Sequence, residues 1–241
     1  MKNVFLKLSM ILIMAILVCS NYTYTVKASK DPIAPEDDKK LIYLTFDDGP
    51  SVLTEKVLNT LEKHGVKATF FLIGNQIQGH EKTVIRMHEE GHGIGLHTYS
   101  HNYNKIYSSR KNFIAEMLKT QNIIYDLIGE RPTIIRFPFG SSKKLTNAYL
   151  EELHKNNFTV YDWNIDMRDG INCNTPVYNL YRFATNTKNV ENPIILLMHC
   201  DYTHKNTCAA LSKVIDYYKK EGYEFKVIDS TTPEMYFKLR K

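Results

Sequence analysis

LIYLTFDDGP, at residues 41–50, joins a short apolar run to two adjacent carboxylates. The run is rich in strand-forming residues, is too short for a helix and ends at Gly49-Pro50, so it predicts a strand that is buried on both faces. Asp47 and Asp48 would then lie side by side at the carboxyl end of this strand. Two carboxylates in such a place repel each other and lose hydration unless a cation or a proton compensates them. Taken alone, the dipeptide is also ordinary chemistry for an exposed turn.

Short apolar segments alternate with helical patterns through the rest of the chain. Strands are expected at residues 41–44, 68–73, 92–97, 133–137, 158–163, 193–198 and 225–228. Helices are expected at residues 52–64, 81–90, 110–128, 146–156, 177–184 and 207–221. This alternation predicts an α/β fold with a parallel sheet, and about seven strands favour a closed or distorted barrel over an open doubly wound sheet. No Gly-x-Gly-x-x-Gly follows the first strand, so nothing indicates dinucleotide binding.

The first 28 residues are predicted to be a secretory signal peptide. Two lysines precede an apolar run at residues 8–19, and the polar stretch that follows ends in VKA at residues 26–28, a small-residue cleavage pattern. Retention of this segment as an N-terminal membrane anchor is the alternative. Residues 29–40 are polar, contain two prolines and are expected to form a linker. We therefore expect a protein that is secreted or held in the cell envelope.

Composition argues against several other classes of protein. The formal net charge is +5, but three of the lysines lie in the predicted signal peptide, which leaves too little charge to indicate nucleic acid binding. Hydrophobic residues make up 43% and charged residues 24% of the chain, as in ordinary globular proteins. Cys173, Cys200 and Cys208 would remain after cleavage, so at most one disulfide can form. The sequence contains no Cys-x-x-Cys pair, so a zinc site built from cysteines is not indicated.

Reactive side chains follow the carboxyl ends of several expected strands. They are Asp47, Asp48, His97, His101, Arg136, Asp166, Asp169 and His199. Parallel barrels assemble their active sites on this face. One helical turn would project His97 and His101 in the same direction, and two imidazoles with a carboxylate suit a hydrolytic zinc site, although a histidine pair alone also fits a polar loop that binds nothing. Six further histidines, among them His92 and His204, are interpreted as surface residues.

Five motifs in this order resemble those of the polysaccharide deacetylases, the NodB-homology domain of carbohydrate esterases. They are TFDDGP at 45–50, HTYSH at 97–101, RFPFG at 136–140, WxxDxxD at 163–169 and LMH at 197–199. The resemblance extends over about residues 41–229 and places a deacetylase domain at residues 41–241. It implies a distorted, NodB-like (β/α) barrel that hydrolyses N- or O-acetyl groups on a sugar polymer.

The resemblance implies a metal site and a base. Asp48, His97 and His101 would bind a divalent metal, with zinc favoured. Asp47 would be the general base that takes a proton from the attacking water, and Arg136 would steady Asp47. Arg136 could instead be only part of a structural ion pair, which is the minority interpretation.

The resemblance also implies an oxyanion site and a general acid. The backbone N–H of Phe139 would help to hold the oxyanion, and Leu197 would line a pocket for the acetyl methyl group unless it is only a core residue. His199, oriented by Asp169, would be the general acid. The chain departs from the family pattern at Phe139, where tyrosine is usual, and at Gly170, where tryptophan is usual. We interpret the second change as the loss of one aromatic wall of the groove, which would alter substrate preference.

These features imply a secreted, metal-dependent hydrolase that removes N-acetyl groups from N-acetylglucosamine in a cell-envelope polysaccharide, with peptidoglycan favoured. Deacetylases of chitin-like oligomers, poly-N-acetylglucosamine or acetylated xylan are the alternative enzymes. A non-catalytic carbohydrate-binding domain is the alternative of another class, and the intact set of carboxylates and histidines argues against it. The expected partner is an acetylated polysaccharide, and the sequence implies neither nucleic acid nor a protein partner.

Overall fold

The computed structural model describes residues 39–240. The predicted signal peptide, and all but the last two residues of the predicted linker, lie outside the described residues. Within residues 39–240, no helix is both long enough and apolar enough to cross a membrane. The helices are α2 (Thr54–His64), the 3-10 turn η3 (Gly74–Gln76), α3 (Glu81–Glu89), α4 (Tyr103–Ile106), α5 (Arg110–Ile128), α6 (Asn147–Lys155), α7 (Val177–Ala184) and α8 (Lys205–Lys220). The strands are β1 (Leu41–Gly49), β2 (Thr69–Leu72), β3 (Gly93–Leu96), β4 (Ile134–Ile135), β5 (Thr159–Val160), β6 (Ile165–Asp166), β7 (Ile194–His199) and β8 (Glu224–Lys226).

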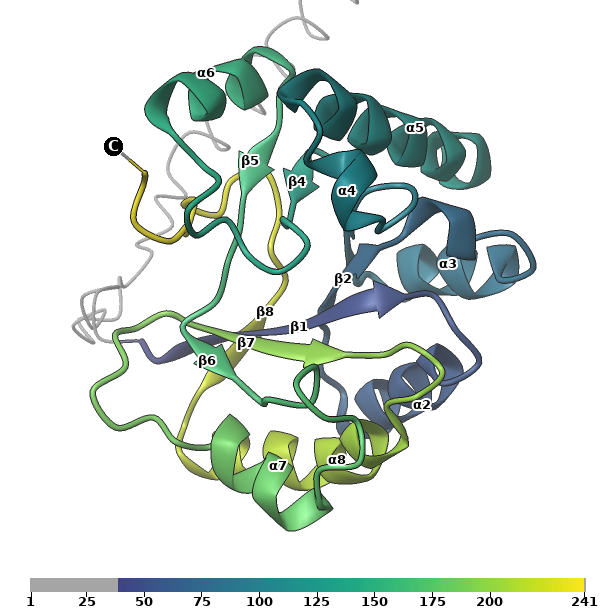
Figure 1. Cartoon of the computed structure of the whole chain (residues 1–241). Coiled ribbons are helices and arrows are strands. Elements are labelled where there is room, and N and C mark those ends of the chain that lie inside the picture. The colour runs from purple at the N-terminus through teal and green to yellow at the C-terminus, as the bar shows by residue number, and fades with distance from the viewer. Residues whose placement is uncertain (1–38, 241) are drawn as a thin grey trace, which may run out of the picture. The chain divides into compact units, whose positions relative to one another are not determined.

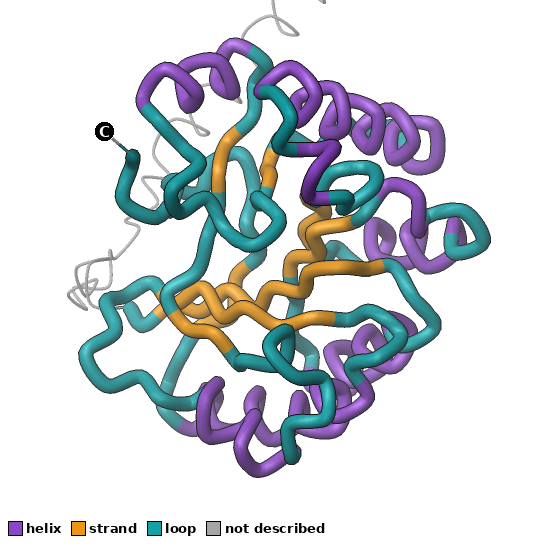
Figure 2. The backbone as a smooth tube through the Cα atoms, viewed as in Figure 1, coloured by secondary structure: helices purple, strands orange, loops and turns teal. Residues whose placement is uncertain are grey.

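All these strands belong to one parallel sheet in the order β5-β4-β3-β2-β1-β7-β6, and β8 pairs with the start of β1. The two ends of this order, β5 and β6, follow each other along the chain but do not pair with each other among the described residues. The sheet therefore curls without closing, and the helices lie around its outer side (Figure 1; Figure 2). This arrangement confirms the expected α/β fold with a distorted parallel barrel of about seven strands.

The central strand β1 explains how a carboxylate reaches the inside of the barrel. Its residues Ile42, Leu44 and Phe46 belong to the main core between the sheet and the helices. Tyr43 belongs instead to a smaller apolar cluster on the inner side of the curled sheet. Because side chains alternate with a period of two along a strand, Asp47 shares the inner face with Tyr43. The apolar residues of β1 thus anchor the strand, and its inner face delivers Asp47 to the carboxyl end.

The strand expected at residues 158–163 is wrong in its second half. Only Thr159–Val160 pair with β4, and Ile165–Asp166 pair with β7 at the other end of the sheet. Between them the chain turns toward the C-terminal segment, because the Asp162 N–H donates to the Met235 carbonyl (2.6 Å) and the Asp162 carboxylate accepts from the Phe237 N–H (2.8 Å). The connection therefore crosses the opening of the barrel, and partners that are distant in the sequence decide its path.

Most expected helices are present with bounds within two residues, and α5 and α7 have the expected bounds. The sequence analysis did not predict α4 or η3. The helix expected from residue 52 begins instead at Thr54, and Val52 is 67% exposed. The Ser51 hydroxyl donates to the Cys200 carbonyl (2.6 Å), which ties the end of β1 to the end of β7.

The three described cysteines are all free thiols, so the single disulfide that the sequence allows is not formed. Cys200 is buried directly after β7, and its Sγ lies 3.6 Å from the Asp47 carbonyl oxygen. A Cβ atom at Gly49 would lie 2.8 Å from this sulfur. Glycine is therefore needed at this position by the close approach of the two strand ends.

Candidate active site

The adjacent carboxylates of β1 point to different places. Asp47 is 3% exposed and lies on the inner face of the barrel. Asp48 has a left-handed backbone conformation (φ 64°), which residues other than glycine rarely adopt. This conformation breaks the strand alternation and brings Asp48 Oδ1 to 3.4 Å from His97 Nε2 and 3.3 Å from His101 Nε2. The dipeptide is therefore not an exposed turn, and its two members have different neighbours.

His97 and His101 converge through a loop rather than through the helical turn that the spacing predicted. Thr98 and His101 both have positive φ angles (67° and 51°), and the Thr98 hydroxyl accepts from the His101 N–H (3.2 Å). The carboxylate of Glu116 in α5 accepts from two further N–H groups of the loop, those of Tyr99 and Ser100, at 3.1 and 2.7 Å. The loop is thus held from α5, and strained backbone of this kind is common where a site fixes its ligands.

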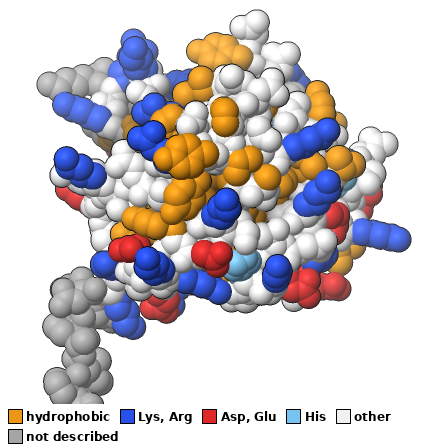
Figure 3. Space-filling view, turned by 90° about the horizontal axis from the view of Figure 1, so that it is seen from below, with side chains coloured by type: hydrophobic (Ala, Val, Ile, Leu, Met, Phe, Trp, Pro, Cys, Tyr) orange, Lys and Arg blue, Asp and Glu red, His pale blue; other side chains and the backbone are white. Residues whose placement is uncertain are grey.

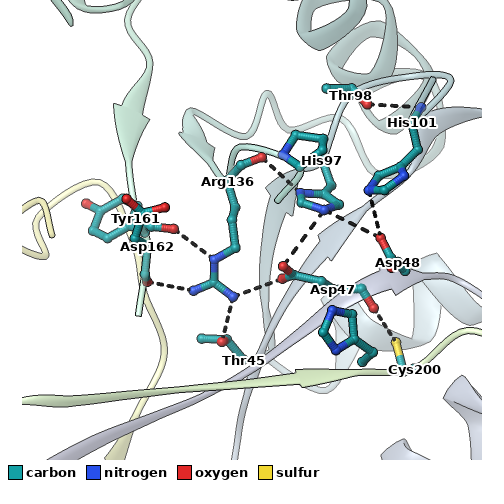
Figure 4. A network of polar contacts seen from close by, with 12 residues as sticks. Thr45, Asp47, Asp48, His97, Thr98, His101, Arg136, Tyr161, Asp162 and Cys200 are labelled. Atoms are coloured by element: carbon teal, nitrogen blue, oxygen red, sulfur yellow. Dashed lines mark hydrogen bonds and ion pairs between the residues drawn. The ribbon is translucent and has the colours of Figure 1, made fainter. Parts of the chain in front are cut away.

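The Asp48, His97 and His101 cluster fits a metal ion. His97 Nδ1 donates to the Arg136 carbonyl (2.9 Å), so the Nε2 lone pair of the neutral ring faces Asp48 (Figure 4). Burial lowers the pKa of His97 to about 3, which keeps this ring neutral. Asp48 Oδ1 is buried and has no hydrogen-bond partner among the described residues. Its separations of 3.3 and 3.4 Å from the two nitrogens are those expected between ligand atoms that each lie about 2.0–2.2 Å from a tetrahedral ion.

Arg136 is fully buried and uses its guanidinium to hold the inner face of the barrel (Figure 4). Its Nη1 donates to Asp47 Oδ1 (2.9 Å) and to the Thr45 hydroxyl (2.7 Å). Its remaining donors reach the carbonyl oxygens of Tyr161 and Asp162 at 2.8 and 3.0 Å. Burial raises the pKa of Asp47, and the charges of Arg136 and His199 oppose this change. A carboxylate with a raised pKa beside a fixed cation is suited to accept a proton.

His199 ends β7 and lies next to Asp47 in the β1–β7 register. Its Nδ1 lies 2.8 Å from Asp169 Oδ1, and Asp169 Oδ2 accepts from the His199 N–H (2.8 Å) and the Thr207 hydroxyl (2.7 Å). Burial lowers the pKa of His199, but the hydrogen bond and charge of Asp169, together with the charges of Asp47 and Asp48, outweigh burial and raise it to about 10. The ring is therefore protonated at neutral pH and can donate a proton from Nε2.

One cavity of about 290 Å³ is lined by Asp47, Asp48, His97, His101 and His199. Phe139 and Leu197 line it as well, which places every residue of the predicted site except Arg136 and Asp169 on its wall. Phe139 has a positive φ (62°), its side chain is 65% exposed, and its N–H makes no hydrogen bond within the part of the chain that the structure describes. Leu197 is buried and leaves only a small apolar surface in the cavity. Arg136 and Asp169 lie behind this wall and hold Asp47 and His199.

Gly170 has a role that the sequence analysis did not indicate. A Cβ atom at this position would lie 2.5 Å from His199 Cε1 and 2.9 Å from His199 Nε2. The imidazole of His199 therefore packs directly on the Gly170 backbone. The absence of a side chain is a condition for this ring position, whatever its effect on the width of the groove.

His92 and His204, which were interpreted as surface residues, are both buried. His204 lines the cavity, is 6% exposed, and its Nδ1 lies 3.0 Å from Asp201 Oδ2. Its ring stacks on His199 at 5.2 Å with an interplanar angle of 22°, which brings a second possible metal cluster together with Asp169. Imidazole lone pairs lie in the ring plane, and two nearly parallel planes do not converge on one ion. We therefore interpret His204 as a support for the His199 ring.

Comparisons with known proteins agree with this geometry. A family model for polysaccharide deacetylases matches residues 34–158. A peptidoglycan-N-acetylglucosamine deacetylase from Bacillus cereus is 36% identical over 197 residues, which cover 78% of this chain and 69% of the relative. The deacetylase PgdA from Listeria monocytogenes is 35% identical over 211 residues, which cover 87% of this chain and 42% of the relative. The crystal structure of the polysaccharide deacetylase Bc1974 from Bacillus cereus matches with a TM-score of 0.75 and 35% identity over 83% of this chain and 97% of that one.

A curled parallel barrel that brings Asp47, Asp48, His97, His101 and His199 together in one cavity at the carboxyl ends of its strands fits a hydrolytic enzyme. The sequence and structure matches specify its class. The chain belongs to the polysaccharide deacetylase family, the NodB-type carbohydrate esterases, and is a hydrolase of amide bonds.

Proposed function

We propose that this enzyme removes the acetyl group from N-acetylglucosamine in peptidoglycan, at a zinc site, outside the cytoplasm. One observation carries the proposal: the buried Asp48 Oδ1, without a hydrogen-bond partner among the described residues, lies between the Nε2 atoms of His97 and His101. The printed names of the Bacillus cereus and Listeria monocytogenes relatives support the substrate. The signal-peptide pattern of residues 1–28 supports the location.

Asp48, His97 and His101 would hold the zinc ion. Two imidazoles and one carboxylate leave a coordination position open, and a zinc ion there supplies Lewis-acid polarisation of an acetyl carbonyl and of water. The Arg136 carbonyl keeps the Nδ1 proton of His97 in place, which reserves Nε2 for the metal. Two neutral donors and one anion leave the site with a net positive charge once a divalent ion is bound.

Asp47 is the general base. The guanidinium of Arg136 fixes Oδ1 at 2.9 Å, so the other carboxylate oxygen, Oδ2, is free to accept a proton from the attacking water. Asp47 Oδ2 lies 3.8 Å from His97 Nε2, which places the base beside the metal site. A new bond forms from the water oxygen to the acetyl carbon as this proton is transferred.

His199 is the general acid. It is the register neighbour of Asp47 on the adjacent parallel strand, so the two side chains project from the same face of the sheet. The carbon–nitrogen bond breaks as His199 Nε2 donates its proton to the departing nitrogen, which leaves acetate and the free amine. An unprotonated amide nitrogen is a poor leaving group, and the Asp169 contact that keeps His199 protonated supplies the proton at neutral pH.

Phe139 and Leu197 would position the acetyl group. The free N–H of Phe139 is available for the negative charge that collects on the carbonyl oxygen. Leu197 offers a small apolar surface for the methyl group. The positive φ of Phe139 turns its N–H away from the local turn, whose bond is made instead between the Gly140 N–H and the Phe137 carbonyl (2.9 Å).

The experiment that tests the proposal measures acetate release from four substrates side by side: peptidoglycan, chitin oligomers, poly-N-acetylglucosamine and acetylated xylan. We expect the highest rate on peptidoglycan, with loss of activity on zinc chelation and recovery on zinc addition. A higher rate on any other polymer identifies that polymer as the substrate and overturns the peptidoglycan assignment. Polysaccharide binding without acetate release from any of the four would mean that the domain only binds carbohydrate.

A further inference from the structure

The turn that presents the Phe139 N–H has a backbone conformation that needs support from its surroundings. The Gly140 N–H donates to the Phe137 carbonyl (2.9 Å), so residues 137–140 form a β-turn. The third residue of this turn, Phe139, has a φ of 62°, where glycine is favoured. A bulky residue is strained in this region and stays there only where its neighbours hold it. The Phe139 N–H is therefore in place for an oxyanion only if other groups fix the turn.

Asp162 holds the end of this turn and is fully buried. Its Oδ1 accepts from the Ser141 N–H (3.0 Å), and its Oδ2 accepts from the Ser141 hydroxyl and from the Phe237 N–H (2.8 Å). Ser141 directly follows the turn and is buried as well. Buried polar groups are costly unless they are hydrogen-bonded, so the carboxylate and its three donors depend on one another. One carboxylate thus ties the residue after the turn to the C-terminal segment.

We propose that Asp162 is a positioning residue for the reaction, whose carboxylate fixes the turn that presents the Phe139 N–H to the oxyanion. The inference deepens the proposed function and rests on it, because it takes Phe139 as an oxyanion donor. Asp162 is fully buried and is not among the residues that line the active-site cavity. It therefore acts through Ser141 and the backbone of the turn, not by contact with the substrate.

The backbone of Asp162 links the same turn to the general base. Its carbonyl oxygen accepts from Arg136 Nη2 (3.0 Å), and Arg136 Nη1 donates to Asp47 Oδ1 (2.9 Å) (Figure 4). Asp162 thus contacts, with its side chain, the residue that follows the oxyanion turn and, with its main chain, the residue that holds the base. A fixed position of Asp162 keeps these two parts of the site in one geometry.

The C-terminal segment holds Asp162 from the other side. The Asp162 N–H donates to the Met235 carbonyl (2.6 Å), and the Phe237 N–H donates to the Asp162 carboxylate. The Phe237 ring also packs against Gly140 in the turn, where a Cβ atom would lie 3.0 Å from Phe237 Cε2. The segment therefore supports the turn twice, once through the Asp162 carboxylate and once through this ring.

Burial of apolar surface alone would not fix the segment in this position. Seen from below, the protein leaves apolar side chains exposed in one broad area, and acidic and basic side chains both lie around it (Figure 3). Exposed apolar side chains are thus tolerated on this protein, as on most. Hydrogen bonds have preferred directions, whereas apolar contacts allow sliding. The bonds to Asp162 are therefore what sets the position of the segment and of the turn.

The test is Asp162→Asn, which keeps the size of the side chain. Whichever oxygen the amide nitrogen replaces, it meets a backbone N–H, either that of Ser141 or that of Phe237. We expect kcat for acetate release to fall by about 10-fold, less than the roughly 10²–10³-fold that the loss of an oxyanion donor costs, because the turn shifts but its N–H remains. KM and metal content per chain should not change, because the donor acts on the transition state.

A binding measurement separates positioning from a general loss of structure. Glucosamine whose nitrogen carries a methylphosphonyl group resembles the tetrahedral, negatively charged intermediate, so its affinity reports on the oxyanion donor without turnover. Asp162→Asn should bind this analogue about 10-fold more weakly, in step with the fall in kcat/KM. Tyr218→Phe is the matched control, because it removes another buried hydrogen bond, to the Ala184 carbonyl (2.6 Å). It should keep the wild-type kcat and analogue affinity.

Ser141→Ala decides if Asp162→Asn does not fold. It leaves the carboxylate and both backbone donors in place and removes only the hydroxyl, so kcat and analogue affinity should fall by about 2- to 5-fold. Wild-type kcat in the folded variants, or a fall in kcat that accompanies loss of metal, would overturn the positioning role. Absence of acetate release by the wild type from any of the four polymers would count against the proposed function instead. The analogue still decides about Asp162 in that case, because equal affinity in the wild type and both variants contradicts the inference.

Discussion

The carbonyl oxygen of Arg136 accepts a hydrogen bond of 2.9 Å from Nδ1 of His97. The guanidinium of the same residue donates a hydrogen bond to Asp47 Oδ1, also at a distance of 2.9 Å. Arg136 therefore fixes the tautomer of a metal-ligand candidate with its backbone and the orientation of the base with its side chain. The family resemblance implied only the second of these roles for Arg136. A residue with both tasks couples the metal site to the base.

Arg136→Lys keeps the positive charge but loses the planar fork that reaches four partners at once. We expect a fall in kcat of about 10²-fold, because the Asp47 carboxylate is no longer held in position to accept a proton from the attacking water. Arg136→Ala leaves the buried Asp47 unpaired and should lower the free energy of unfolding by about 3–5 kcal/mol. Denaturant unfolding and acetate release measure the two effects. Wild-type kcat in Arg136→Lys would show that charge alone suffices.

Asp47 and Asp48 are chemically identical, so only their positions can give them different roles. Asp48→Ala should lose metal affinity and activity together, because it leaves two imidazoles without a charged partner. Asp47→Asn keeps the shape but cannot accept the proton, so it should retain the metal while turnover falls by about 10²–10⁴-fold. Metal content per chain, measured beside acetate release, separates the two. Loss of metal in Asp47→Asn with retention in Asp48→Ala would reverse the assignment.

The pH dependence of activity should depend on Asp169. The pKa of His199 is raised from 6.5 to about 10, so the acid form persists through the neutral range and is lost only as the pH approaches the higher value. Asp169→Asn removes the charge that favours the protonated ring, so the pKa of His199 should fall. The alkaline limb of the kcat/KM profile should then move to lower pH, with metal content unchanged. An alkaline limb that stays in place would show that another group is the acid.

Gly170→Ala tests the contact between the backbone and His199. The added Cβ would lie 2.5 Å from His199 Cε1, so the ring must move to accommodate it. We expect kcat to fall by about 10-fold or more, because displacement of a reacting group by about 1 Å can cost 10²-fold. Gly170→Trp should show at least the same loss in addition to any change in preference among polymers. The measurement is kcat with metal content per chain, and Cys173→Ala in the same loop serves as a control; a Gly170→Ala enzyme with wild-type kcat would contradict the prediction.

The first 28 residues predict where the protein is located. We expect the mature chain to begin near Ser29 and to be found outside the cytoplasm. N-terminal sequencing of the native protein from extracellular, envelope and cytoplasmic fractions measures this directly. A chain that retains Met1 in the envelope would support the membrane-anchor alternative, and an intact chain in the cytoplasm would contradict export.

Local signals were sufficient for much of the fold. The α5 helix has the predicted bounds because Ser109 caps its first turn (3.1 Å to the Asn112 N–H) and Gly129 ends it in a left-handed conformation. The buried run of β1 and the breaker after it identified the central strand. Parallel strands present reactive groups at their carboxyl ends, and this rule correctly predicted that Asp47 and His199 lie at the same edge of the sheet. All of these are properties of neighbouring residues or of a repeating pattern, so they can be predicted from the amino-acid sequence.

The way in which the side chains of the site meet depends on tertiary contacts. The positive φ of Asp48, the anchoring of the histidine loop by Glu116 and the burial of His204 depend on contacts between segments far apart in the chain. The packing of His199, at the end of β7, on the Gly170 backbone likewise joins two segments that are about thirty residues apart in the chain. A periodic pattern reports which face of an element is apolar, but it carries no information about which distant atom will fill the space opposite. The partners of Arg136 and the opening between β5 and β6 depend on how the whole sheet curls, so they could not be predicted from the sequence patterns.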